Sequence, residues 1–216
     1  MNKYFYNGLP TYLMSKFCAV RDSLDNFSNM LTVAEIVNTS HHCLVGNEGN
    51  VEFNVAVFTG DYRRILIRKN GGYFSMAIPF QVVTQGDQLS FNSDALGEAV
   101  SGRFIAIMRN CIQTTKENSI SHEDVIYSLM ENFNLSMSDA MRYFDAFASF
   151  ISEDHGYFRF DDDPINEDGD FHPRFHFDFF YKNTSAVKIG YDRLAQLSCI
   201  YSLVDSSIPK KYLTNR

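Results

Sequence analysis

The sequence predicts an α+β fold, in which an N-terminal helix and an antiparallel meander precede a helical centre and a C-terminal antiparallel hairpin sheet closed by a helix. Three observations predict it. Hydrophobic residues recur at three- and four-residue steps from residue 13 to residue 31, the spacing of one helix face. Beyond residue 51 hydrophobic and polar residues alternate, as in a strand, and this alternation returns after residue 157. Between these two stretches, helix-type repeats follow Ser and Asp residues that suit helix caps.

The N-terminal half contains the first helix and the meander. The expected helix face carries Leu13, Phe17, Val20, Leu24, Phe27 and Leu31. Strands are expected over residues 51–57, 62–69, 73–80, 81–83 and 88–91. The first of them should be half-buried, because Glu52 and Asn54 alternate with hydrophobic residues. Asn70-Gly71-Gly72 should form a tight turn, since Asn and Gly tolerate positive φ angles.

The central helices are expected where capping residues precede hydrophobic repeats. The expected caps are Ser93 or Asp94, then Ser121, then Ser136 or Ser138. The first helix should run to about residue 118, and residues 132–135 should separate the other two. A helix pair joined by a short turn raises the question of a DNA-binding helix-turn-helix. The expected recognition helix carries Arg142 as its single basic residue, which favours plain helix packing.

The segment 171–182 shows the clearest strand pattern in the chain. Because side chains alternate across a strand, the apolar and aromatic residues at odd positions from 171 to 181 share one face, and the polar residues at even positions from 170 to 178 share the other. Residues 157–161 alternate in the same way and are expected to pair with it. Five phenylalanines should then lie on one buried face: Phe158, Phe160, Phe175, Phe177 and Phe179. A last helix, ending near Val204, should close this sheet.

The opposite face of this hairpin is the candidate binding site, and it carries Arg159, Arg174, His176 and Asp178. Such a group can bind an anion, relay a proton or hold the hairpin together, and the sequence leaves these roles open. His176 and Asp178 lie about 6.6 Å apart along a strand and could share a metal with Asp161. A network of ion pairs and hydrogen bonds is the simpler interpretation. We therefore expect neither a metal nor a cofactor.

Composition excludes several classes of protein. The net charge of −7 disfavours binding to nucleic acid, and we expect no specific recognition of duplex DNA. The four cysteines form no CxxC pair, which disfavours a zinc ribbon or a redox dithiol. Phosphate-binding glycine loops and a GxSxG nucleophile elbow are absent. In the acidic segment 161–170, Pro164 would take the first ligand position of an EF-hand, so that loop is excluded. Without a signal peptide or an apolar membrane span, a cytoplasmic protein is expected.

The segment His172-Pro173-Arg174-Phe175-His176-Phe177-Asp178, followed by a short strand and a final helix, resembles the C-terminal end of small uncharacterised bacterial proteins with an HPxxH strand. Such proteins are often encoded near toxin–antitoxin or phage-defence genes. The resemblance covers residues 157–204 at most. It implies a biological setting and no catalytic residues.

Taken together, these patterns favour one domain over residues 1–216, with lobes at 1–92 and 93–216. The expected function is that of a non-catalytic, protein-binding accessory or regulatory component, with a bacterial defence or toxin–antitoxin system as its setting. The alternative is a small metal-dependent hydrolase or nuclease that uses the polar face around His176 and Asp178. The partner is expected to be another protein, with no membrane involved. The sequence leaves the oligomeric state open.

Overall fold

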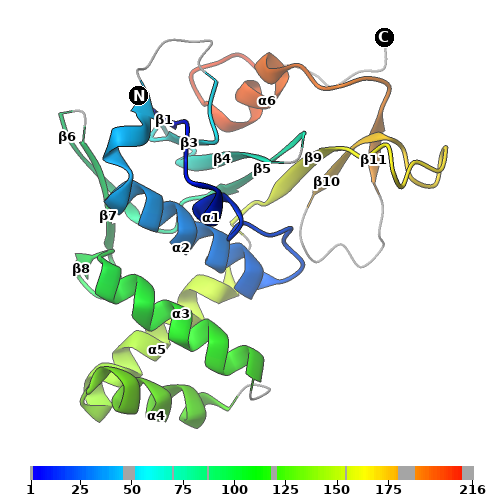
Figure 1. Cartoon of the computed structure of the whole chain (residues 1–216). Coiled ribbons are helices and arrows are strands. Elements are labelled where there is room, and N and C mark those ends of the chain that lie inside the picture. The colour runs from blue at the N-terminus through cyan, green and yellow to red at the C-terminus, as the bar shows by residue number, and fades with distance from the viewer. Residues whose placement is uncertain are drawn as a thin grey trace. The chain divides into compact units, whose positions relative to one another are not determined.

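The computed structural model describes residues 2–45, 52–69, 71–86, 88–117, 121–153, 155–179 and 188–210 (Figure 1). These residues form an α+β fold with an antiparallel sheet, as the sequence predicts. Two compact units are present. Unit 1 comprises residues 1–14, 42–78 and 154–216, and unit 2 comprises residues 15–41 and 79–153. The lobes expected from the sequence, 1–92 and 93–216, follow the order of the chain, whereas each unit combines separate stretches of it.

Unit 1 contains an eight-stranded sheet in the order β11-β10-β9-β5-β4-β3-β1-β2. Its strands are β1 (Lys3–Tyr6), β2 (Leu44–Val45), β3 (Val55–Phe58), β4 (Arg64–Lys69), β5 (Gly72–Ala77), β9 (Phe158–Asp162), β10 (Phe175–Phe179) and β11 (Ile189–Tyr191). All neighbouring strands are antiparallel. The predicted C-terminal hairpin, β9–β10, is present, and β9 also pairs with β5 of the meander. The meander and the hairpin therefore belong to one sheet.

Strand β3 differs from its prediction. It was expected over residues 51–57 with one exposed face, but it spans Val55–Phe58 and all four residues are buried. The strand lies between β1 and β4, so its backbone is paired on both sides. The polar residues that indicated an exposed face, Glu52 and Asn54, precede the strand.

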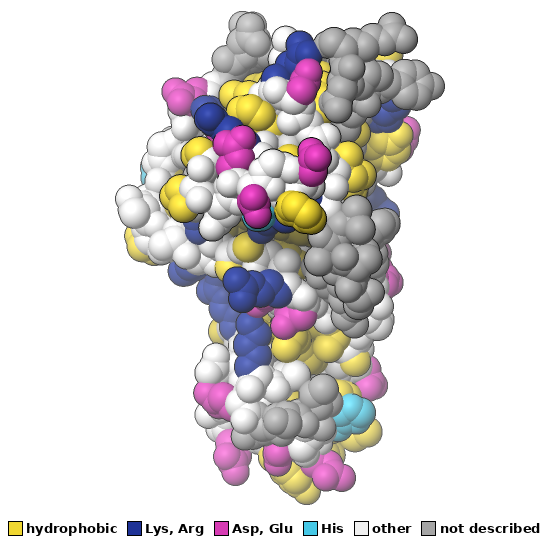
Figure 2. Space-filling view, turned by 90° about the vertical axis from the view of Figure 1, so that its right-hand side faces the viewer, with side chains coloured by type: hydrophobic (Ala, Val, Ile, Leu, Met, Phe, Trp, Pro, Cys, Tyr) yellow, Lys and Arg dark blue, Asp and Glu magenta, His cyan; other side chains and the backbone are white. Residues whose placement is uncertain are grey.

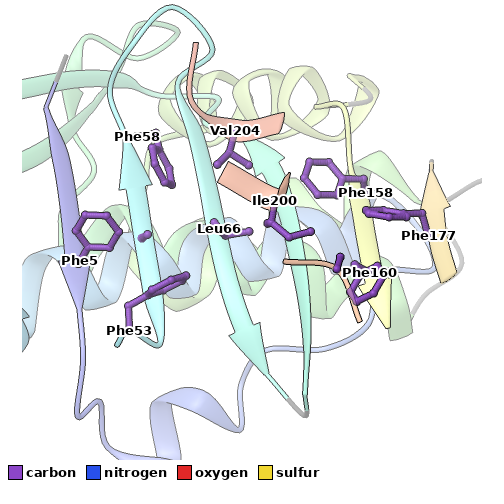
Figure 3. Packing of buried hydrophobic residues seen from close by; sticks show 11 residues of the cluster. Phe5, Phe53, Phe58, Leu66, Phe158, Phe160, Phe177, Ile200 and Val204 are labelled. Carbon is purple, nitrogen blue, oxygen red and sulfur yellow. The ribbon is translucent and has the colours of Figure 1, made fainter. Parts of the chain in front are cut away.

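The phenylalanine face of the hairpin forms part of the core of unit 1. Phe158, Phe160 and Phe177 are buried and pack with Ile200 and Val204 of helix α6 (Leu197–Val204), as Figure 3 shows. The rings of Phe160 and Phe177 lie 4.8 Å apart. Two further members of the predicted set, Phe175 and Phe179, are half-buried and pack against the same cluster. The alternation therefore assigned the core face correctly, and α6 is the helix that closes it.

An ion pair joins the first strand of unit 1 to the end of its last helix. Lys3 Nζ lies 2.6 Å from Asp205 Oδ2, and the Asp205 side chain is fully buried at the C-cap of α6. Ser207 donates to the other carboxylate oxygen from its backbone N–H (2.9 Å) and its hydroxyl (2.6 Å). Burial alone would raise the pKa of Asp205, but the bonds from Lys3 and Ser207 outweigh it and lower the pKa.

Unit 2 combines four helices with a three-stranded sheet. The helices are α2 (Ser23–Thr39), α3 (Gly102–Glu117), α4 (His122–Phe133) and α5 (Met137–Ser152), and the sheet, in the order β6-β7-β8, consists of β6 (Gln81–Gln85), β7 (Gln88–Ser93) and β8 (Glu98–Ala99). Phenylalanines also fill this core. Phe27 stacks on Phe150 at 5.1 Å, and Phe80 meets Phe150 edge-on at 5.4 Å.

Two helix boundaries differ from the prediction. The expected helix face that starts at Leu13 is broken, because α1 spans only Thr11–Met14 and α2 begins after Asp22. The carboxylate of Asp22 caps α2 by accepting from the backbone N–H of Asp25 at 2.8 Å. Hydrophobic residues at helical spacing can thus lie on separate elements, here α1 of unit 1 and α2 of unit 2.

The first central helix begins at Gly102 rather than after Ser93. Ser93 ends strand β7, and a turn and β8 follow it before α3 starts. Ser, Asp and Asn favour turns as well as helix caps, which explains the misplaced start. The other caps were predicted correctly, since the side chains of Ser121 and Ser136 accept from backbone N–H groups three residues on. Asn134 ends α4 in a left-handed conformation (φ 51°).

We predict that Phe177→Ala destabilises the protein by about 3–5 kcal/mol, because it removes a ring that is 1% exposed from the core of unit 1. Urea unfolding followed by circular dichroism measures this change. Phe171→Ala is the matched control, since the Phe171 side chain is 90% exposed and its removal leaves no cavity. An equal midpoint for wild type and Phe177→Ala would contradict the core assignment.

Candidate functional site

The register of the hairpin brings charged residues together on the face opposite the phenylalanines. Asp178 faces Arg159, and His176 faces Asp161 across the strand pair. The guanidinium of Arg159 binds both carboxylates. Its Nη2 donates to Asp178 Oδ2 at 2.7 Å, and its Nε lies 2.7 Å from Asp161 Oδ2. Three of the four predicted site residues, Arg159, His176 and Asp178, thus share one cluster.

His176 is the buried centre of this cluster, with a side chain that is 1% exposed. Its Nδ1 lies 2.7 Å from the carbonyl oxygen of Pro173. A carbonyl oxygen can only accept, so Nδ1 carries the proton and donates it. In the neutral ring Nε2 then holds the lone pair, and it faces Asp161 Oδ2 at 3.5 Å and Asp178 Oδ2 at 3.8 Å.

Lys188 completes the cluster and is the residue that sequence reasoning missed. Its ammonium lies 2.9 Å from His176 Nε2 and 3.2 and 3.3 Å from the two carboxylate oxygens of Asp178. The sequence does contain a signal for it, because residues 186–191 have a strand-type pattern beyond the predicted hairpin. Pairing of Ile189 with Phe177 places Lys188 next to Asp178. We call Arg159, Asp161, His176, Asp178 and Lys188 the polar cluster.

Arg174, the fourth predicted site residue, lies outside the polar cluster. Its Nε donates to Asp162 Oδ1 at 2.7 Å, and its guanidinium lies over the ring of Phe175 at 4.8 Å. The alternation expected over 171–182 begins only at Phe175, where β10 starts. Arg174 therefore precedes the strand and does not share the face of His176.

Opposing influences act on the pKa of His176. Burial lowers it, and the charge of Lys188 lowers it further. Hydrogen bonds to Asp161 and to the Pro173 carbonyl, together with the charge of Asp178, raise it and prevail, so the pKa lies above the ordinary value. Protonation puts a hydrogen on Nε2, which can then donate to a carboxylate but can no longer accept from the ammonium of Lys188.

Three members of the polar cluster form a donor set for a divalent ion. One ligand atom each from Asp161, His176 and Asp178 lies within 4.8 Å of the others. The Nδ1–H of His176 donates to a backbone carbonyl, as it does in many metal-bound histidines. The ammonium of Lys188 lies against the same nitrogen and carboxylate, so an ion binding there would have to displace it. In the described arrangement, the cations Arg159 and Lys188 neutralise the two carboxylates.

The consecutive residues His41-His42-Cys43 also include three side chains of metal-binding type, but they do not converge as the polar cluster does. These residues form a 3₁₀ turn in which both histidines are exposed and Cys43 is buried.

Within the described residues, no helix is both long enough and apolar enough to cross a membrane.

Comparisons of the chain with protein-family models, curated proteins and solved structures found no match.

We predict that Asp178→Asn lowers stability by about 1–3 kcal/mol, because it leaves Arg159 and Lys188 without a shared carboxylate. Asp192→Asn is the control, since Asp192 pairs with Arg193 at an exposed site, and we expect a change below about 0.5 kcal/mol. Urea unfolding measures both variants. Equal losses in the two would contradict a stabilising role for the polar cluster.

A pH dependence follows from the raised pKa of His176. The folded protein holds this proton more tightly than the unfolded chain does. The resulting stabilisation is fully present below the unfolded pKa of about 6.5 and is lost as the pH rises through the folded pKa. His176→Asn should flatten the stability profile across this window, and a profile that keeps its slope would assign the proton to another group.

Proposed function

We propose that this protein is a non-catalytic, protein-binding accessory or regulatory component that presents the β9–β10 loop, residues 163–174, to its partner. A single observation carries the proposal. Ile165 and Phe171, both in this loop, are each 90% exposed. Large hydrophobic side chains held this far into solvent are typical of contact residues that enter a pocket on a partner.

The loop is ordered by its own hydrogen bonds. The backbone N–H and the side-chain amide of Asn166 donate to the carboxylate of Asp163 at 3.0–3.2 Å. Asp168 and His172 exchange backbone hydrogen bonds at 2.9 and 3.2 Å, and Gly169 takes the positive φ angle (49°) of the turn between them. His172 Nε2 also lies 3.4 Å from Asp163. A loop ordered in this way loses little conformational entropy on binding.

The charge around the two hydrophobic side chains indicates the kind of partner. Asp163, Glu167, Asp168 and Asp170 lie in the loop. Figure 2 shows the side of the molecule that carries β9 to β11, and acidic side chains lie there among hydrophobic ones. An apolar pocket with a rim of Lys or Arg would complement this surface, and its charge would speed association at low salt.

The biological setting in this proposal comes from the resemblance of the segment 172–178 to the HPxxH strand. By that resemblance, the partner belongs to a bacterial defence or toxin–antitoxin system. The proposed cytoplasmic location comes instead from the sequence, in which a signal peptide and an apolar membrane span were not found.

A metal-dependent hydrolase or nuclease is the second candidate, and the convergence of Asp161, His176 and Asp178 favours it. Because Lys188 lies against these ligands, its positive charge should oppose the binding of a metal ion.

We predict that Lys188→Met strengthens Zn²⁺ binding at least roughly tenfold over wild type, and that adding Asp178→Asn abolishes the gain. Isothermal titration with zinc chloride measures both effects. A stoichiometric ion retained by dialysed wild-type protein, together with phosphodiester hydrolysis that Asp178→Asn removes, would establish the enzyme instead.

For the protein-binding proposal, we predict that Phe171→Ser and Ile165→Ser each weaken partner binding at least roughly tenfold, because each removes a side chain that would fill a pocket. Immobilised wild-type protein is used to capture partners from a lysate of the native host. The captured protein is then purified and titrated against each variant.

The control for this experiment is Leu194→Ser, which alters a residue that is 52% exposed elsewhere in unit 1 and should leave affinity unchanged. Raising the salt concentration should weaken wild-type binding, since the proposed partner rim is basic. Equal affinity of wild type, Phe171→Ser and Ile165→Ser would show that the loop is not the contact.

A further inference from the structure

Strand β6 (Gln81–Gln85) lies at the outer edge of the sheet of unit 2 (Figure 1), and among the described residues its only strand neighbour is β7. Four of its five residues are exposed, and the fifth, Val82, is half-buried. One side of its backbone therefore presents N–H and C=O groups without a strand to pair with. Such an edge is a template for another strand.

The other described edges are protected by their length or their charge. β2 and β8 have two residues each, and β11 has three and is followed by Asp192 and Arg193. Strand β6 has five residues and contains neither a charged residue nor a proline, the features by which edge strands avoid pairing. Its exposed edge is thus the one most open to pairing.

The register with β7 shows which backbone groups point outward. Gln85 faces Gln88 at the hairpin end, and Val83 faces Ser90. The carbonyl oxygen of Val83 accepts from the Ser90 hydroxyl at 3.5 Å, so it points towards β7. Because hydrogen-bonding direction alternates along an antiparallel strand, the N–H and C=O groups of Val82 and Thr84 point away from the sheet.

The sequence of β6, Gln-Val-Val-Thr-Gln, is nearly symmetric about Val83. We propose that a second copy of this chain pairs with β6 in antiparallel orientation, with a two-fold axis at Val83. Gln81 of one copy then faces Gln85 of the other, and Val82 faces Thr84, a residue of similar branched shape. Each Val82–Thr84 pair exchanges both backbone hydrogen bonds, while the two Val83 side chains meet on the solvent face between them.

The absence of charge explains why a second copy fits this edge. In a two-fold interface every residue meets the matching patch of the other subunit, so a charged strand would place like charges near one another. An edge with polar amides at its ends and branched residues between them meets its own copy without repulsion. The continuous sheet would then contain six strands in the order β8-β7-β6-β6-β7-β8.

Sedimentation velocity of the full chain over a wide concentration range tests the pairing. Wild type should show a reversible monomer–dimer equilibrium. Val83→Lys places two ammonium groups opposite each other, about 4.5–5.5 Å apart at Cβ, and should raise the dissociation constant at least roughly tenfold. The control is Ser90→Lys, which adds the same charge to an exposed residue of the same face one strand inward, and it should leave the constant nearly unchanged.

Cross-linking tests the register independently and does not depend on the stability of Val83→Lys. Cys18 and Cys199 are replaced by Ser, while Cys43 and Cys111 are buried and stay in place. Oxidation should link two copies of Val83→Cys by a disulfide, and likewise two copies of the double variant Gln81→Cys, Gln85→Cys. It should leave Gln81→Cys unlinked, because residue 81 of one copy faces residue 85 of the other. A chain that stays monomeric at every concentration and does not cross-link through residue 83 would overturn the proposal. A monomer that binds a foreign extended peptide at β6 would overturn it as well and identify a different occupant.

Discussion

The pairing of β5 with β9 is the constraint on which the rest of unit 1 depends. These strands are separated by residues 79–153, which belong to unit 2, and yet Phe74 faces Arg159 and Ser75 faces Phe158. A backbone hydrogen bond from Ala77 to His155, 2.8 Å long, closes the chain just beyond the pairing. The approach is so tight that a Cβ on Gly72 would lie 2.5 Å from the carbonyl oxygen of Phe160. The close approach of β9 therefore requires glycine at this position of the sheet.

This pairing fixes the faces of the hairpin. With β9 in the central sheet, its phenylalanines are aligned with those of β10 beneath α6, and its charged residues necessarily face the other way. The buried aromatic face and the polar cluster are thus two consequences of one register. A shift of the strand register by one residue would put Arg159 and His176 into the core and expose Phe160 and Phe177. The loss of hydrophobic packing opposes such a shift.

The sequence predicted these faces because alternation is a local property, and it failed where non-local contacts decide. Strand β3 reads as half-buried in isolation, but pairing with β1 and β4 and the burial of all its residues follow from its central place in the sheet. Ser93 suits a helix cap and a turn equally well, and pairing of Asn92 and Ser93 with β8 selects the strand and turn. Lys188 became part of the site only through the pairing of β11 with β10, a non-local contact that a local residue pattern does not specify.

The distribution of charge in the hairpin supports the proposal that a partner contacts the loop rather than the polar cluster. Within the polar cluster, Arg159 and Lys188 are directed at Asp161 and Asp178, so their charges are largely satisfied within the hairpin. In the loop, Asp163 is bound by Asn166 and His172, while Glu167 and Asp170 are exposed, as are the hydrophobic side chains of Ile165 and Phe171. A compensated cluster stabilises the strands that carry it and has little net charge left to attract a ligand. The loop, in contrast, has exposed carboxylates and two exposed hydrophobic side chains.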